Sequence, residues 1–305
     1  MSANQEKTAD PKTGGPRYLI HMKKLRTARE LETSAAADLR SKTRAVPLPG
    51  GEVLAMLARR GFRPSKARLD VPFPENLEEA TAERLSEMLG HYAFRLFLRG
   101  AIQRTESFAP EEATQYLDRA QAKEFAESLV GLGLAERLAR GCYRLSWAAK
   151  SFGGTLEWYV ARELQRRLAF DVASGVRLHA RGVGGDLDVL AAAEGKLAYL
   201  ELKSSPPKNL SVREVAAFFD RVSVLRPDLT LFVVDTALRL SDKVVPMLVG
   251  ELEHRRGKTK LAPRRLVREL WALAPHLYAL NGRPDLMANI GRAIAHGLLA
   301  LSPPL

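Results

Sequence analysis

The residues best suited to chemistry lie on either side of a tight turn at Glu194-Gly195. Two acids, Asp186 and Asp188, precede the turn, and Glu201 and Lys203 follow it. Both stretches read as short β-strands, so the two members of each pair share one face of a sheet. The sequence therefore predicts that carboxylates and a lysine gather on one patch.

A two-residue turn at this position fixes which residues face each other across the two strands. It pairs Ala193 with Lys196 and, continued outward, sets Asp188 opposite Glu201. Asp186 shares the face of Asp188, but its place beside a loop favours a solvated acid over a metal ligand. The apolar residues of both strands are expected in a core: Leu187, Val189, Leu200 and Leu202.

This set of side chains fits the hydrolysis of a phosphodiester. Mg²⁺ prefers oxygen ligands and keeps several waters, so two or three carboxylates and a substrate phosphate suffice. Asp188, Glu201 and the Leu202 carbonyl are the candidate inner-shell ligands. A bound metal lowers the pKa of a water and stabilises the charge that grows on the phosphate. Lys203 can orient that water or stabilise the transition state, and the planar charge of an arginine would be a poor substitute.

A third carboxylate is suggested by the helix expected over residues 155–169. Glu157 falls in the middle of the apolar stripe of this helix, and Glu163 falls at its rim. A carboxylate in such a stripe is costly unless it binds a metal or pairs with a cation. Glu157 is therefore either an active-site acid or part of a buried salt bridge, with Lys203 as the candidate partner. The stripe consists of Val160, Ala161, Leu164 and Leu168.

The order of these segments resembles the PD-(D/E)xK nuclease superfamily, which has the restriction-endonuclease-like fold, and in particular its Holliday-junction-resolvase-like members. The resemblance covers roughly residues 150–300: helix, strand, Gly-Asp-Leu-Asp-Val-Leu, Tyr-Leu-Glu-Leu-Lys and helix. It implies that Asp188 is the first metal-binding acid and that Glu201 and Lys203 are the second acid and the lysine. It also implies that Glu157 is the acid of the preceding helix. No proline precedes Asp188, as in the Gly-x-x-Asp form of resolvase-like members.

The elements that position these residues alternate between helix and strand, which predicts an α/β domain over residues 151–305. Ser211 and Glu214 form a capping-box pattern at the start of the helix after the strand pair. Arg213 and Arg221 on that helix are expected at the surface, where they could face DNA. The expected elements are helix 155–169, strand 172–180, the strand pair, helix 211–226, strand 229–235, helix 241–256, helix 263–273, strand 276–280 and helix 284–300.

Residues 51–150 carry helical patterns and end in a hairpin, and residues 88–148 resemble a winged-helix domain, whose members bind DNA or only protein. The resemblance implies that helix 119–130 enters a major groove and that the hairpin is the wing. Residues 1–50 are polar and are expected to be a basic, largely disordered tail. The fold class is thus α/β: a restriction-endonuclease-like mixed sheet flanked by helices, after a mostly helical winged-helix-like domain. The implied DNA contacts are Arg119, Gln121 and Lys123 from the helix and Arg137, Arg140 and Arg144 from the wing.

The composition favours a polyanionic partner, with nucleic acid first, although a merely basic surface is the alternative. The net charge is +12, from 47 Lys and Arg against 35 Asp and Glu, and the sequence pI is near 9.9. The single Cys142 excludes an internal disulfide and a cysteine-based zinc cluster and agrees with a reducing compartment. No apolar run reaches the roughly 18 residues of a membrane span, and the first residues lack a signal-peptide core. A cytoplasmic protein is therefore expected, associated with the nucleoid if it binds DNA.

These features together predict a Mg²⁺-dependent DNA endonuclease, with Mn²⁺ as a substitute metal, in defence, repair or mobile-element processing. Cutting both strands would need two active sites, which points to a homodimer. The sequence leaves RNA open as a substrate. Two alternatives come from other classes: an inactive fold relative that binds DNA or assembles complexes, and a winged-helix transcription regulator.

Overall fold

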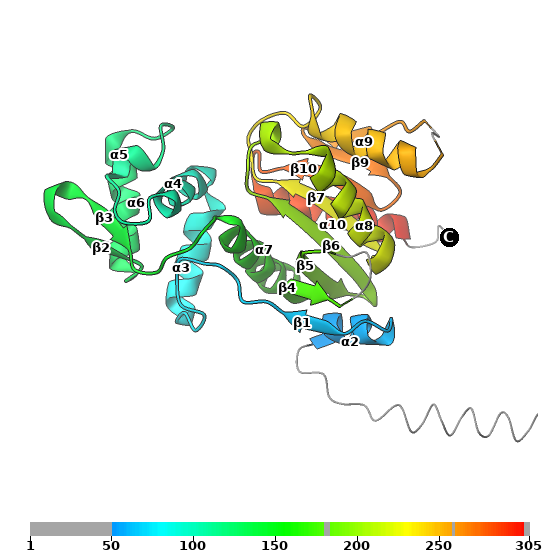
Figure 1. Cartoon of the computed structure of the whole chain (residues 1–305), viewed down its shortest axis with the longest axis horizontal. Coiled ribbons are helices and arrows are strands. Elements are labelled where there is room, and N and C mark those ends of the chain that lie inside the picture. The colour runs from blue at the N-terminus through cyan, green and yellow to red at the C-terminus, as the bar shows by residue number, and fades with distance from the viewer. Residues whose placement is uncertain (1–50, 180–183, 258–259, 302–305) are drawn as a thin grey trace, which may run out of the picture. The chain divides into compact units, whose positions relative to one another are not determined.

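The computed structural model describes residues 51–179, 184–257 and 260–301. A helical region precedes an eight-stranded mixed sheet flanked by helices, so the expected α/β class is confirmed (Figure 1). The helices are α2 (Gly51–Arg59), α3 (Glu79–Gly90), α4 (Tyr92–Gln103), α5 (Pro110–Ala113), α6 (Arg119–Gly131), α7 (Gly153–Leu168), α8 (Val212–Leu225), α9 (Val244–Arg255) and α10 (Leu286–Leu301). The strands are β1 (Pro64–Lys66), β2 (Ala135–Arg137), β3 (Tyr143–Leu145), β4 (Asp171–Leu178), β5 (Asp186–Ala193), β6 (Lys196–Lys203), β7 (Leu229–Val234), β8 (Arg264–Val267), β9 (Leu270–Ala274) and β10 (Leu277–Asn281). Among the described helices, none combines the length and apolarity that spanning a membrane requires.

The strand order in the large sheet is β1-β4-β5-β6-β7-β10-β9-β8. Strands β6, β7 and β10 run parallel to one another, and the other neighbours pair antiparallel. Ligands of such sheets commonly bind outside the carboxyl ends of the parallel strands. The ends of β6, β7 and β10 are therefore the edge at which a site is expected.

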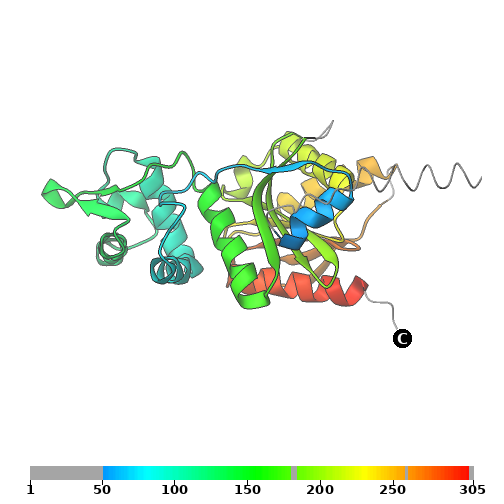
Figure 2. The same cartoon turned by 90° about the horizontal axis from the view of Figure 1, so that it is seen from below.

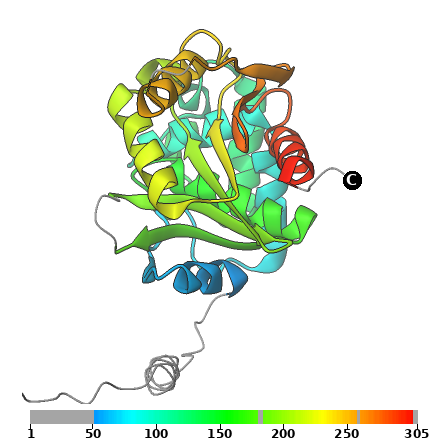
Figure 3. The same cartoon turned by 90° about the vertical axis from the view of Figure 1, so that its right-hand side faces the viewer.

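Both faces of the sheet are covered, as Figures 2 and 3 show. One apolar cluster joins the sheet to α7 and α10, and the other joins it to α2, α8 and α9. The four predicted core residues of β5 and β6 are buried, but Leu187 lies in a different cluster from Val189. The regular alternation of β5 side chains between the two faces of the sheet is therefore interrupted at Asp188. At this point the pairing of β4 with β5 skips Gly175, whose φ is +59°.

The β5–β6 hairpin has the predicted register, because Ala193 pairs with Lys196 and the ladder continues without a shift to Val189 and Leu200. Glu194 and Gly195 have φ values of 53° and 69°, the backbone of a tight two-residue turn. The capping box at the start of α8 is also present, with Ser211 and Glu214 each bonded to the other's backbone N–H.

The prediction of a helix over 263–273 was wrong, because this segment forms the hairpin β8–β9. Its Arg, Glu, Leu and Ala residues favour a helix locally, but β9 gains a partner in β10 and a two-residue turn at Arg268-Glu269. The short β1, which the sequence did not reveal, pairs with β4 at the edge of the sheet. It has only three residues, too few for a periodic pattern.

The helical region contains the helix and the hairpin that the sequence predicted. Helix α6 spans almost the predicted range, and β2 and β3 form the predicted hairpin. A single bridge from Phe108 to Tyr143 adds a third strand-like segment. Helix α2 packs on the large sheet and β1 is one of its strands, although both fall in the range 51–150. The division into domains stays a prediction, and the expected tail over 1–50 lies outside the described residues.

Candidate active site

The predicted carboxylates and lysine meet at one end of the β5–β6 hairpin. Asp188 lies near the start of β5, and Glu201 and Lys203 lie at the end of β6. Because the two strands are antiparallel, these ends are adjacent. The Leu202 backbone N–H donates to Asp188 Oδ2 at 2.7 Å, which holds the first acid against the neighbouring strand.

Glu201 is buried and surrounded by donors. Its Oε1 accepts from Arg221 Nη2 at 2.7 Å and from Lys203 Nζ at 2.9 Å. Its Oε2 accepts from the Tyr199 hydroxyl. A carboxylate offers about four lone-pair positions, so three of them are occupied here.

Lys203 is half-buried, and its ammonium also lies 3.7 Å from Glu214 Oε1 on α8. Burial lowers the pKa of Lys203, but attraction to Glu201, Asp188 and Glu214 outweighs it, so the net pKa lies above its ordinary value. Lys203 is therefore a cation across the neutral range. It can stabilise negative charge but cannot serve as a general base.

Glu157 on α7 is half-buried, and within the described part of the chain it makes no hydrogen bond or ion pair. Burial, with repulsion from Asp186 and Glu201, raises its pKa from 4.5 to about 7, against the opposing attraction of Lys203. The alternative of a salt bridge between Glu157 and Lys203 was wrong, because the Lys203 ammonium pairs with Glu201 and Glu214.

The pKa of Asp188 is raised well above its ordinary value. Burial is the largest cause, and repulsion from Glu201 and Glu157 adds to it. The acids thus hinder one another's ionisation, since like charges at short range disfavour the charged form. A cation bound among them would remove this repulsion.

The oxygen donors suit Mg²⁺, although among the described residues no group of three His, Cys, Asp or Glu side chains is placed to hold a metal together. Asp188 Oδ1 and both oxygens of Glu157 have no hydrogen-bond partner in the described ranges. Glu201 retains about one open lone pair. The free oxygens of Asp188 and Glu157 therefore suit a divalent metal, with water or phosphate completing the shell.

Two positions that sequence reasoning missed complete the cluster: Arg221 and Tyr199. Arg221 was expected at the surface, but it is buried and donates to Tyr199 Oη at 2.9 Å and to the Gly184 carbonyl at 3.3 Å, in addition to Glu201. A signal existed, because Arg221 lies three residues after the core residue Phe218 and so on the buried face of α8. The other arginine of this helix, Arg213, is exposed as expected.

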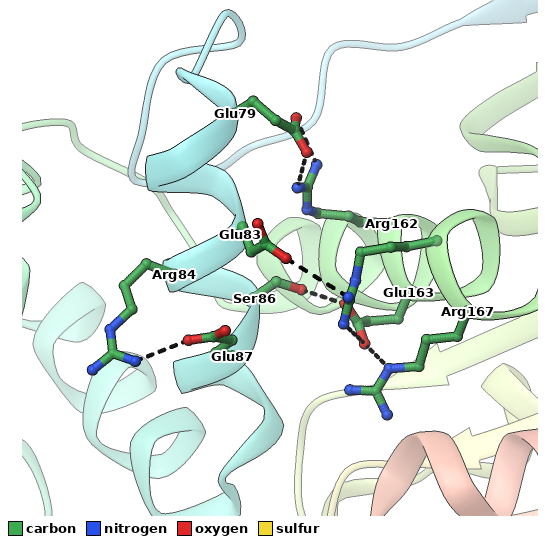
Figure 4. Close-up of polar contacts among 9 residues, drawn as sticks. Glu79, Glu83, Arg84, Ser86, Glu87, Arg162, Glu163 and Arg167 are labelled. Carbon is green, nitrogen blue, oxygen red and sulfur yellow. Dashed lines mark hydrogen bonds and ion pairs between the residues drawn. The ribbon is translucent and has the colours of Figure 1, made fainter.

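Glu163 was expected at the rim of the apolar stripe of α7, but it is fully buried. Figure 4 shows it between α3 and α7, where Ser86 Oγ donates to it at 2.8 Å and Arg167 pairs with it. Leu168, expected in the stripe, is 40% exposed. The buried stripe is turned toward α3, because α3 contacts this side of α7. Glu163 therefore ties two helices together, whereas Glu157 stays available to the site.

The six predicted DNA contacts lie on α6 and the β2–β3 hairpin, and none of them bonds to Glu157, Asp188, Glu201 or Lys203. Three are paired with acids: Arg119 with Glu111, Arg137 with Glu127 and Arg144 with Glu136. The other three, Gln121, Lys123 and Arg140, are exposed and form no ion pair with the described residues. Their role in DNA binding stays a prediction.

The chain matches no protein-family model and no curated protein. Solved structures that are distantly similar include VC1899 and Can2. The protein VC1899 from Vibrio cholerae has a TM-score of 0.45 and 15% identity, over 89% of this chain and 74% of its own. Can2 from Sulfobacillus thermosulfidooxidans, solved in complex with cyclic tetra-adenylate, has a TM-score of 0.41 and 15% identity over 79% of this chain. The alignment spans 59% of the Can2 chain, less than two thirds of its length.

Proposed function

We propose that this chain is a metal-dependent endonuclease that hydrolyses phosphodiester bonds of DNA. The observation that carries the proposal is the crowding of Glu157, Asp188 and Glu201 around Lys203 at one end of the β5–β6 hairpin. The raised pKa values of Glu157 and Asp188 come first from burial and then from repulsion by neighbouring carboxylates, and a divalent cation would relieve that repulsion. A purely structural ion-pair network has no need of an acid without a partner. In the described part of the chain, Glu157 is an acid without a hydrogen-bond or ion-pair partner.

In this proposal Asp188 and Glu157 would hold Mg²⁺, and water with a substrate phosphate would complete its shell. When bound, the metal supplies an activated water and stabilises the charge on the phosphate. The Lys203 ammonium has three N–H donors and forms ion pairs with Glu201 and Glu214. It can donate to a phosphate oxygen and stabilise the charge that develops there.

Arg221 and Tyr199 act as positioning residues. Both donate to Glu201, which in turn holds the ammonium of Lys203. The lysine is thereby fixed before substrate arrives, and fixed charges stabilise a transition state better than mobile ones.

DNA is the proposed substrate because the chain has a net charge of +12 and its helical region resembles a winged helix. Lys123 and Arg140 are exposed and without an ion pair among the described residues, so they can contact phosphates. The role in defence, repair or mobile-element processing and the homodimer belong to the same proposal.

A second candidate is a DNA-binding or assembly protein that keeps the fold without cutting. It is favoured by the three donors on Glu201, because a closed ion-pair network can be purely structural. In this case the Glu201–Arg221–Lys203 network stabilises the sheet edge, and no metal binds.

The test is cleavage of plasmid, branched junction, single strand and RNA with Mg²⁺ or Mn²⁺. The wild type is compared with Asp188→Asn, Lys203→Ala and the control Asp242→Asn, which removes the charge of an exposed acid outside the site. We expect cutting by the wild type and the control and a loss of at least 100-fold in the other two. Nucleic-acid binding without any cutting would instead support the second candidate, and equal cutting by all four proteins would exclude this site.

A further inference from the structure

A second polar site lies outside the catalytic cluster. It is a cavity of about 310 Å³. Three arginines reach it from three separate connections: Arg239 from the segment between β7 and α9, Arg268 from the β8–β9 turn and Arg283 from the segment between β10 and α10. Its remaining lining residues are Ala237, Glu269 and Asn281.

The charge of this cavity is unbalanced. Arg239, Arg268 and Arg283 are exposed, and within the described ranges none of them forms an ion pair. The one acid in the lining, Glu269, is engaged elsewhere: its Oε2 accepts from the Leu240 N–H at 2.8 Å, and its Oε1 pairs with Arg265 at 3.2 Å. Three guanidinium groups held around one cavity repel one another, and an anion between them would relieve the repulsion.

Two of the loops that carry these arginines, those of Arg239 and Arg283, are fixed by buried amides. Asn281 is fully buried; its Nδ2 donates to the Leu238 carbonyl at 2.8 Å, and its Oδ1 accepts from the Arg283 N–H at 3.2 Å. Asn289 Nδ2 donates to the carbonyls of Asn281 and Arg283, at 2.9 Å each. The backbone of the site is therefore held in place before any ligand binds, which lowers the entropic cost of binding.

The cavity lies on the same edge of the sheet as the catalytic cluster. Lys203 ends β6, and its carbonyl accepts from the N–H of Asp235, the residue after β7. Arg283 follows β10, the next strand, and Arg268 belongs to the turn before β9, one strand further. Neighbouring strands are separated by nearly 5 Å, so the cavity is about 10 to 15 Å from Lys203 along the edge.

We infer that this three-arginine cavity binds phosphate of the DNA strand, at a position removed from the bond that is cut. The inference rests on the proposed function. Guanidinium forks match phosphate oxygens in geometry and charge, and arginine stays charged at any relevant pH. At 3.4 Å per nucleotide of duplex, the separation corresponds to about three or four nucleotides. The phosphate is internal to the strand or is its 5′-terminal group.

The test measures binding of a fluorescent DNA duplex by anisotropy at several salt concentrations, with EDTA to prevent cutting. The test variant is Arg239→Gln with Arg283→Gln. The control is Arg59→Gln with Arg84→Gln, which removes the same charge from exposed arginines that are paired with Glu52 and Glu87. We expect at least a tenfold loss of affinity and a salt slope lower by about 1 to 2 in the test variant only. The melting temperatures of both variants should match that of the wild type, because all four side chains are exposed.

The outcomes separate this inference from the proposed function. Equal affinity and slope in the test variant, with a wild type that binds, overturns the arginine site and leaves the nuclease proposal standing. Lost binding in the test variant, with no cleavage by the wild type in Mg²⁺, supports the arginine site and overturns the nuclease. A wild type that binds no DNA overturns both. Duplexes with and without a 5′-phosphate show which phosphate is bound. A site for the terminal phosphate binds the two duplexes with different affinity, and a site for an internal phosphate binds them equally.

Discussion

At the scale of single residues, the proton on Glu157 links the candidate site to stability. Burial and repulsion from Asp186 and Glu201 raise the pKa of this acid from 4.5 to about 7. Between these values the folded protein holds a proton that the unfolded chain releases. The free energy of unfolding therefore decreases as the pH rises from about 4.5 to 7 in the absence of metal.

Between pH 5 and pH 8, the titration of Glu157 is expected to lower the free energy of unfolding by about 3 kcal/mol at most. The Glu157→Gln variant should lack this contribution. Urea denaturation in EDTA at both pH values measures the change. Glu106→Gln, an exposed acid on another part of the chain, is the matched control. The same pH dependence in Glu157→Gln and wild type would contradict the prediction.

Arg221 should be essential for stability, since it is the buried partner of Glu201. Removing one partner of a buried ion pair leaves an uncompensated charge, which costs about 3 to 5 kcal/mol. We expect Arg221→Met to lower the free energy of unfolding by about 3 kcal/mol, because Lys203 still neutralises part of the charge. Arg213→Met on the same helix is exposed and should change it by less than about 0.5 kcal/mol. Chemical denaturation measures the free energy of unfolding of both variants. Similar values for both would show that the contact of Arg221 with Glu201 does not stabilise the fold.

The sequence was sufficient to bring Asp188 near Glu201 and Lys203 because the turn at Glu194-Gly195 fixes the register of β5 and β6 as far as Val189 and Leu200. It did not reveal the change of alternation at Asp188. It was insufficient for Tyr199 and Arg221. Their contact with Glu201 depends on how α8 lies on the sheet, and that is set by packing over long sequence distances. The burial of Glu163 was not predicted for the same reason, because the packing of α3 determines which side of α7 is buried.

At the scale of elements, two helical glycines should respond oppositely to alanine. A methyl group at Gly100 in α4 would lie 1.6 Å from the Ala113 carbonyl oxygen, whereas one at Gly250 in α9 meets nothing within 4 Å. Gly100→Ala should therefore force α4 away from α5 and lower the melting temperature by several degrees. Gly250→Ala should stabilise the protein by about 0.5 to 1 kcal/mol through helix propensity. Calorimetry of both variants tests the contact, and a neutral Gly100→Ala would show that α4 and α5 can separate freely.

Elements with local signals were predictable, and those without them were not. The capping box set the start of α8, and the tight turn at Glu194 and Gly195 set the register of β5 and β6. The segment 263–273 has good helix formers, and only pairing with β10 decides that it is a hairpin. In β1, the three residues Pro64–Lys66 gain their conformation from β4 alone.

At the scale of the whole molecule, Asp235 connects the helical region to the sheet. It follows β7, its carboxylate is fully buried, and it accepts from Arg95 at 3.0 Å and Arg99 at 2.9 Å, both on α4. We expect the described part to unfold in one transition because of this link. Asp235→Asn should lower the free energy of unfolding by about 3 kcal/mol and resolve two transitions in calorimetry. Asp242→Asn, an exposed acid, is the control, and two transitions already in the wild type would contradict the prediction.

The position of α2 has a consequence for how the chain is made on the ribosome. This helix is bonded to β4 through the Val53 N–H and Asp171 Oδ2, across 118 residues of sequence. At about 5 to 20 residues per second, roughly 6 to 24 s pass between the synthesis of the helix and that of its partner strand. Four apolar side chains of α2, Val53, Leu54, Met56 and Leu57, have no sheet to cover during that interval. Nascent chains stalled before residue 171 should therefore recruit chaperones at this helix and release them once β4 has emerged.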